Sequence, residues 1–129
     1  MKNNTETIFL HDEEHIISYK RNAKELNIWI EHLDYIDNEI DYLQKLSEQK
    51  NPNPEKAYLI NKLEKKRAEN ESILKEIIKY SENHYLINEC DDIECDYLFI
   101  HKHESYRERY DHFVKSYRTI KNEVFHLML

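Results

Sequence analysis

The chain has 129 residues, a net charge of −7 and no glycine. Without glycine it cannot build the glycine-rich loops that cradle phosphates in P-loop and dinucleotide-binding enzymes, and its negative charge argues against binding nucleic acid by neutralising phosphates. Its apolar runs stay well below the roughly 18 residues that a membrane-spanning helix needs. We therefore expect one soluble helical domain over residues 1–129, with no nucleic-acid or membrane partner, and the polar N-terminus predicts a cytoplasmic protein.

A first helix is predicted over about residues 12–49. Its apolar side chains recur in alternating steps of three and four residues, which is the spacing of a left-handed coiled-coil seam. The seam positions are Tyr19, Asn22, Leu26, Trp29, Leu33, Ile36, Ile40 and Leu43.

Outside that seam, a second row of large apolar side chains repeats every seven residues at Ile28, Tyr35 and Tyr42. A second row on one helix indicates a further surface that something else covers. Tyrosine is favoured at protein interfaces, because it buries a large area at low cost in conformational entropy. These three residues are the predicted interface, with a homodimer as the expected assembly.

A second helix is predicted over about residues 54–88. Asn53 can cap its start, and Pro54 suits the first helical position because its φ is fixed. The centre of this helix is polar apart from Ala68. Arg67 and Asn70 must therefore face the seam, or the helix must bow away from its neighbours.

A third helix is predicted over about residues 92–128, with a capping box made by Asp91 and Glu94. Its seam is the most regular of the three. The positions are Phe99, His103, Tyr106, Tyr110, Phe113, Tyr117, Ile120, Val124 and Leu127.

Three helices of similar length joined by short turns predict an all-α fold, in which three long antiparallel helices form a coiled-coil-like up-down-up bundle. Folding the chain at its two turns places Leu33 opposite Asn70, Tyr19 opposite His84, and His84 opposite His103. The alternative is a helical hairpin whose third helix completes a four- or six-helix dimer.

The same folding collects histidines at one end of the bundle and raises a metal-binding or metal-sensing alternative. His15, His84 and His103 would be the ligands, because imidazole binds zinc and related divalent transition metals. Cys90 and Cys95 lie at the same end, and in a cytoplasmic protein they are expected as reduced thiols. The leading interpretation needs no cofactor; this alternative needs zinc or another divalent transition metal.

The segment from Arg107 to His112 resembles the Arg-x4-His signature of HEPN-type helical ribonucleases, and that resemblance implies RNA cleavage. Residues five apart lie about 140° apart around a helix, which separates the two side chains. This ribonuclease is the second alternative. The leading hypothesis assigns no catalytic residue: a non-enzymatic helical-bundle protein that acts through contacts with a protein partner or with a second copy of itself.

Overall fold

The computed structural model describes the backbone of residues 4–48 and 53–128, and the side chains of residues 17–48 and 53–128. Three long helices follow one another along the chain, α1 (Asn4–Glu48), α2 (Pro54–Asn83) and α3 (Ile93–Met128), with a short 3-10 helix, η1 (His84–Glu89), after α2. No strand occurs in these ranges. The all-α prediction is confirmed, although α1 begins earlier than residue 12.

Helices α2 and α3 each begin with a side-chain cap. The Asn53 side chain accepts a hydrogen bond from the backbone N–H of Lys56 at 2.8 Å, and Pro54 occupies the first turn of α2 as predicted. At α3 the predicted cap was wrong by one residue. The side chain of Asp92, rather than that of Asp91, accepts from the backbone N–H of Cys95 at 2.8 Å. An oxygen at this position satisfies one of the unpaired N–H groups of the first turn.

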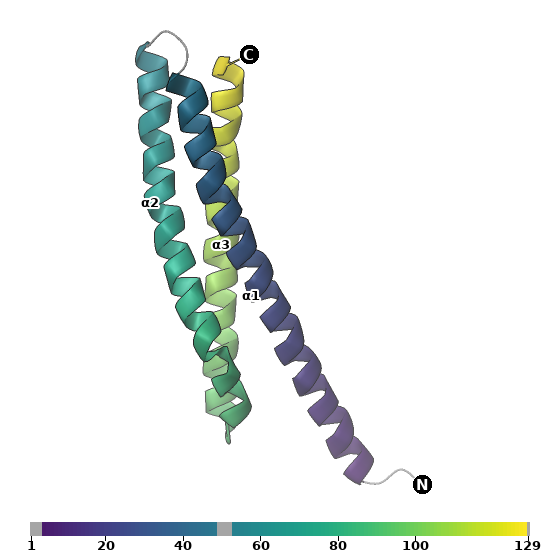
Figure 1. The fold of residues 1–129 in the computed structure, drawn as a ribbon. Helices are drawn as coiled ribbons and strands as arrows, with labels where there is room; N and C mark the ends of the chain where they lie inside the picture. Colours follow the sequence, from purple (N-terminus) through teal and green to yellow (C-terminus); the bar gives the residue numbers. More distant parts are fainter. Residues whose placement is uncertain (1–3, 49–52, 129) are drawn as a thin grey trace.

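Helix α2 runs opposite to α1 and α3 (Figure 1). The Asn70 amide donates to the Leu33 carbonyl oxygen at 2.8 Å, and the Tyr19 and His84 rings stack with centroids 5.1 Å apart. The step back along α1 from Leu33 to Tyr19 equals the step forward along α2 from Asn70 to His84. The expected antiparallel pairing therefore holds over that length, and α2 does turn Asn70 into the seam.

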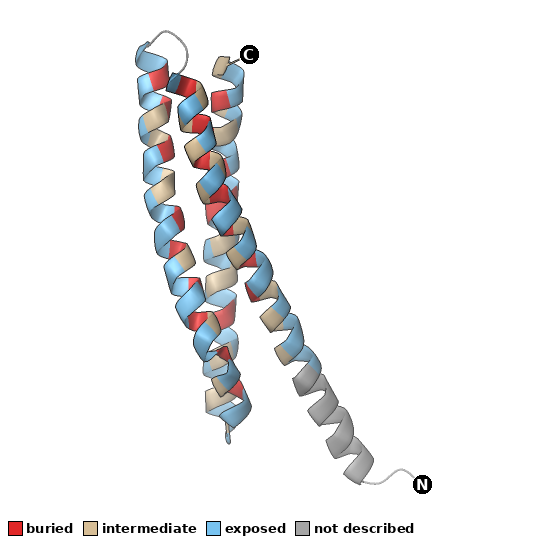
Figure 2. Cartoon of the chain, in the orientation of Figure 1, coloured by how far each residue is buried: buried red, intermediate tan, exposed pale blue. Residues whose placement is uncertain are grey.

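The core is a narrow seam along the inner faces of the helices (Figure 2). Most of the seam positions predicted in the first and third helices are buried: Leu26, Trp29, Leu33, Ile36, Ile40, Leu43, His103, Phe113, Tyr117, Ile120 and Val124. Ile77 of α2 is buried as well. Tyr110 is only partly buried. Its hydroxyl bonds to His32 at the edge between α1 and α3, which holds the ring at the rim of the seam.

Toward its N-terminus α1 diverges from the other two helices (Figure 1). At the same end of the molecule, the first turns of α3 carry large apolar side chains that are exposed: Ile93, Tyr97, Leu98 and Ile100. The three helices thus pack closely over most of their length and separate at the end that holds the N-terminus.

Candidate functional site

Three polar contacts between α1 and α3 repeat at intervals of seven residues. We call them the polar ladder. Its rungs are Glu25 with His103, His32 with Tyr110, and Glu39 with Tyr117. Each rung joins residues 78 positions apart in the chain, so the two parallel helices stay in one register along the whole ladder.

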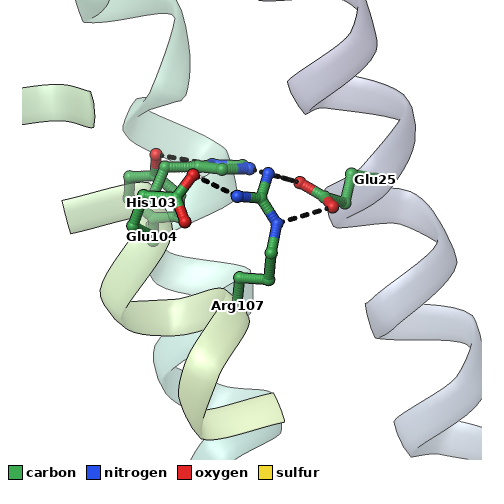
Figure 3. A network of polar contacts seen from close by, with 5 residues as sticks. Glu25, His103, Glu104 and Arg107 are labelled. Carbon is green, nitrogen blue, oxygen red and sulfur yellow. Dashed lines mark hydrogen bonds and ion pairs between the residues drawn. The ribbon is translucent and has the colours of Figure 1, made fainter. Parts of the chain in front are cut away.

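The first rung is the most elaborate (Figure 3). His103 Nε2 donates to Glu25 Oε1 at 2.7 Å, since a carboxylate can only accept, and the Tyr80 hydroxyl is hydrogen-bonded to His103 Nδ1 at 2.9 Å. Arg107 donates to the same carboxylate twice, from Nη2 to Oε1 at 2.6 Å and from Nε to Oε2 at 2.9 Å. Its third nitrogen, Nη1, pairs with Glu104. One carboxylate of α1 therefore accepts hydrogen bonds from a histidine and an arginine of α3.

The third rung repeats this arrangement two heptads further along. Tyr117 donates to Glu39 Oε1 at 2.6 Å, and the Lys121 ammonium donates to Oε2 at 2.9 Å. In both outer rungs a glutamate of α1 meets a buried ring of α3 and a cation four residues later. The middle rung, His32 with Tyr110, has no cation of this kind.

The two ladder glutamates stay ionised at neutral pH. Burial by itself raises the pKa of Glu25, but hydrogen bonds and charge from Arg107 and His103 outweigh it, so the net pKa lies below the ordinary value. The same balance, with Tyr117 and Lys121 as partners, lowers the pKa of Glu39. The ladder is thus a charged structure, held by charge-assisted hydrogen bonds.

Two of the histidines proposed as metal ligands meet inside the bundle. The rings of His84 and His103 lie 5.8 Å apart, and both side chains are buried. Burial and then the neighbouring His103 lower the pKa of His84, and its Nε2 has no hydrogen-bond partner among the described residues. Both nitrogens of His103 are already bonded, to Tyr80 and Glu25, so it would have to give up one partner to hold a metal.

The third proposed ligand, His15, belongs to α1, but its side chain lies outside the described residues. Among the side chains that are described, no three histidine, cysteine or acidic groups come together in a way that could hold a metal ion. The zinc alternative stays a prediction, with the unpartnered nitrogen of His84 as its best support.

The two residues of the ribonuclease-like segment lie on different sides of α3. Arg107 points toward α1 and is held there by Glu25 and Glu104. His112 is exposed and lines a groove against Ala68 and Glu69 of α2. The two side chains therefore do not converge on a shared site.

The predicted interface row lies on the outer face of α1. Ile28 is 61% exposed, Tyr35 60% and Tyr42 64%, which places all three outside the core. Beside the two tyrosines runs a mainly apolar groove between α1 and α3, lined also by Leu46 and Phe125. We call Ile28, Tyr35 and Tyr42 the aromatic row, and the groove lies beside its two tyrosines.

The prediction of two free thiols was wrong. Cys90 and Cys95 form a disulfide across the turn between η1 and α3. The turn is tight enough to bring their Cα atoms to 5.5 Å, a distance that a disulfide spans readily. The bond ties the first turn of α3 to the end of η1.

Comparison with protein-family models, with curated proteins and with solved structures gave no match to this chain. Within the described residues, no helix is both long and apolar enough to cross a bilayer. The polar ladder was missed at the sequence level. The signal that could have revealed it is the seven-residue spacing of Glu25, His32 and Glu39, which is the same as that of the α3 residues they contact.

Proposed function

We propose that this chain is a non-enzymatic helical-bundle protein that acts through protein–protein contacts, and that it forms a homodimer through the aromatic row. The observation that carries the proposal is the exposure of Ile28, Tyr35 and Tyr42 in one line on α1. Single exposed apolar residues are ordinary on protein surfaces, but a regular row of them beside an apolar groove favours an interaction site.

The aromatic row is long enough to organise an interface but too small to be the whole of it. Ile28 and Tyr42 are separated by about 21 Å along the helix, at 1.5 Å per residue. Fully burying a large apolar side chain contributes about 1.5–3 kcal/mol, whereas association costs at least about 4 kcal/mol. Three partly exposed side chains come close to that cost, so the adjoining groove has to be covered as well.

The proposal includes no catalytic role, because the titratable side chains in closest contact use their hydrogen-bonding groups on one another. Glu25 accepts from His103 and Arg107, and His103 is also hydrogen-bonded to Tyr80. A cytoplasmic location belongs to the proposal, and the Cys90–Cys95 disulfide is the observation against it, since such bonds persist mainly in oxidising compartments.

The test is the mass of the protein in solution. Light scattering after size exclusion should give about twice the 15.9 kDa chain mass. Replacing Tyr35→Glu together with Tyr42→Glu should shift the protein toward monomer, because burying two new charges opposes association. Tyr58→Glu is the matched control, since Tyr58 is equally exposed at 58% but lies on α2. If the wild-type protein is a monomer at tens of micromolar, the proposal is wrong. If the Tyr35→Glu and Tyr42→Glu double variant is still a dimer, the interface lies on another surface.

A further inference from the structure

Between residues 20 and 34 the exposed face of α1 is divided into a basic half and an acidic half. The flanking charges of the basic half are Lys20, Arg21 and Lys24, and those of the acidic half are Glu31 and Asp34. All five are exposed, and none forms an ion pair with another residue in the part of the chain that the structure describes. Among the described side chains of one copy, no ion pair accounts for this arrangement.

These charges border the aromatic row. Arg21 lies seven residues before Ile28, and Glu31 lies three residues after it, so all three share one face of the helix. Lys20 and Asp34 are two heptads apart and therefore occupy equivalent positions along the edge of that face. Any helix that covers the aromatic row must also meet this pattern of charge.

A second copy of α1 can meet the pattern in two orientations. A parallel copy sets basic against basic and acidic against acidic, and such facing like charges disfavour a pairing. An antiparallel copy sets each basic segment against the acidic segment of its partner. Charges at the flanks of paired helices select orientation in this way.

We infer that two copies pair antiparallel through α1, with the basic half of each facing the acidic half of the other. The inference rests on the proposed homodimer and specifies its geometry. The two-fold axis then passes close to Ile28, midway between the basic and acidic groups. The two Ile28 side chains meet at the centre, where contacts are most fully shielded from water.

The divergence of α1 fits the same arrangement. Its N-terminal half leaves its own bundle (Figure 1), while the groove beside Tyr35 and Tyr42 is uncovered in a single copy. In the antiparallel pair this half of α1 lies along the partner's groove. Ile17, which is 54% exposed, then comes opposite Asn38 on the groove wall of the other copy.

Charge reversal tests the complementarity. The basic-half variant carries Lys20→Glu, Arg21→Glu and Lys24→Glu, and the acidic-half variant carries Glu31→Lys and Asp34→Lys. Each alone should weaken dimerisation by about tenfold or more at low salt, because like charges then face each other. The variant with both halves reversed should recover wild-type affinity, and an equal mixture of the two single-half variants should form heterodimers. Sedimentation equilibrium measures the dissociation constant of the dimer for the two single-half variants, for the variant with both halves reversed and for the mixture. Circular dichroism verifies that each variant is helical.

Cross-linking tests the orientation. Ile17→Cys and Asn38→Cys chains, mixed and treated with a short bis-maleimide under non-reducing conditions, should link to each other rather than to their own kind. The native cysteines do not interfere, because they are bonded to each other. The antiparallel pairing is wrong if like positions link to each other, or if reversing the charges of either half leaves the dimerisation affinity unchanged. Either result is compatible with a homodimer of another geometry. If the wild-type protein is a monomer, both the proposed homodimer and its antiparallel geometry are wrong.

Discussion

Replacing Glu25→Gln removes the one charge that holds the first rung together while keeping the shape of the side chain. In the native protein this carboxylate accepts three hydrogen bonds, one from His103 and two from Arg107. Hydrogen bonds to a charged group contribute about 1.5–3 kcal/mol each in favourable cases. The amide still offers one acceptor, and Arg107 keeps Glu104, so the loss should be well below the sum.

We expect Glu25→Gln to lower the free energy of unfolding by about 1–3 kcal/mol at neutral pH, since the site is partly exposed to solvent. That corresponds to a fall in Tm of roughly 3–5 °C for each kcal/mol in a chain of this size. Urea unfolding followed by circular dichroism, at one fixed protein concentration, measures the difference without a contribution from mass action.

The effect of this substitution should also depend on pH. Because the pKa of Glu25 is lower in the folded protein than its ordinary value of 4.5, the unfolded state takes up the proton first as the solution is acidified. The stabilisation is present above that value and is lost as pH falls through the folded pKa. The difference in the free energy of unfolding between wild type and Glu25→Gln should therefore narrow as the pH falls below 4.5.

Glu108→Gln is the matched control for this experiment, because Glu108 is exposed on α3 next to Arg107 and makes no interhelical bond in the described part of the chain. Its effect should stay within about 0.5 kcal/mol. If Glu25→Gln costs no more than this control, or if its cost is the same at neutral and acid pH, the charged rung does not stabilise the bundle.

Three further predictions concern the seam and the histidines buried in it. Leu33→Ala, at a fully buried position, should cost about 2–5 kcal/mol in urea unfolding, and a loss below about 0.5 kcal/mol would mean that Leu33 does not pack in the core. Because burial lowers the pKa of His84, stability should be complete above the ordinary value of 6.5 and should fall as pH drops below it, so Tm at about pH 5.5 should lie below that at about pH 7.5. His84→Phe should flatten this dependence. Zinc that raises Tm in wild type but not in His103→Gln would establish the metal alternative, whereas an unchanged Tm would weigh against it.

The pairing of α2 with its neighbours could be predicted from the sequence. The contacts of Leu33 with Asn70, Tyr19 with His84, and His84 with His103 all follow from heptad spacing and two short turns. Short turns make consecutive helices antiparallel, and the turn positions then fix which residues lie opposite. The aromatic row was predictable for a similar reason, because seven-residue spacing outside a seam identifies an outer face.

The relation between α1 and α3 could not be predicted in the same way. These helices are not consecutive, so no turn sets their rotation about each other. In the sequence, Glu25 and Glu39 look like two ordinary surface charges among 26 acidic residues. Their role depends on which face of α1 turns toward α3. The disulfide was missed for a different reason: its formation depends on the local geometry of the turn, which the spacing of two cysteines does not determine.

The unlike rungs of the polar ladder have a consequence for alternative alignments of the chain. If α3 shifts by seven residues relative to α1, apolar residues still face apolar residues. A regular seam therefore does not by itself exclude such a shifted alignment. Counted along the sequence, a slide in one direction sets Glu39 against Val124 and Met128, so its charge is buried with no donor. A slide in the other direction sets Glu25 against Asp96. Because both of these displaced alignments leave a carboxylate without a donor or facing another carboxylate, the native alignment is the one of the three that leaves no ladder charge unpaired.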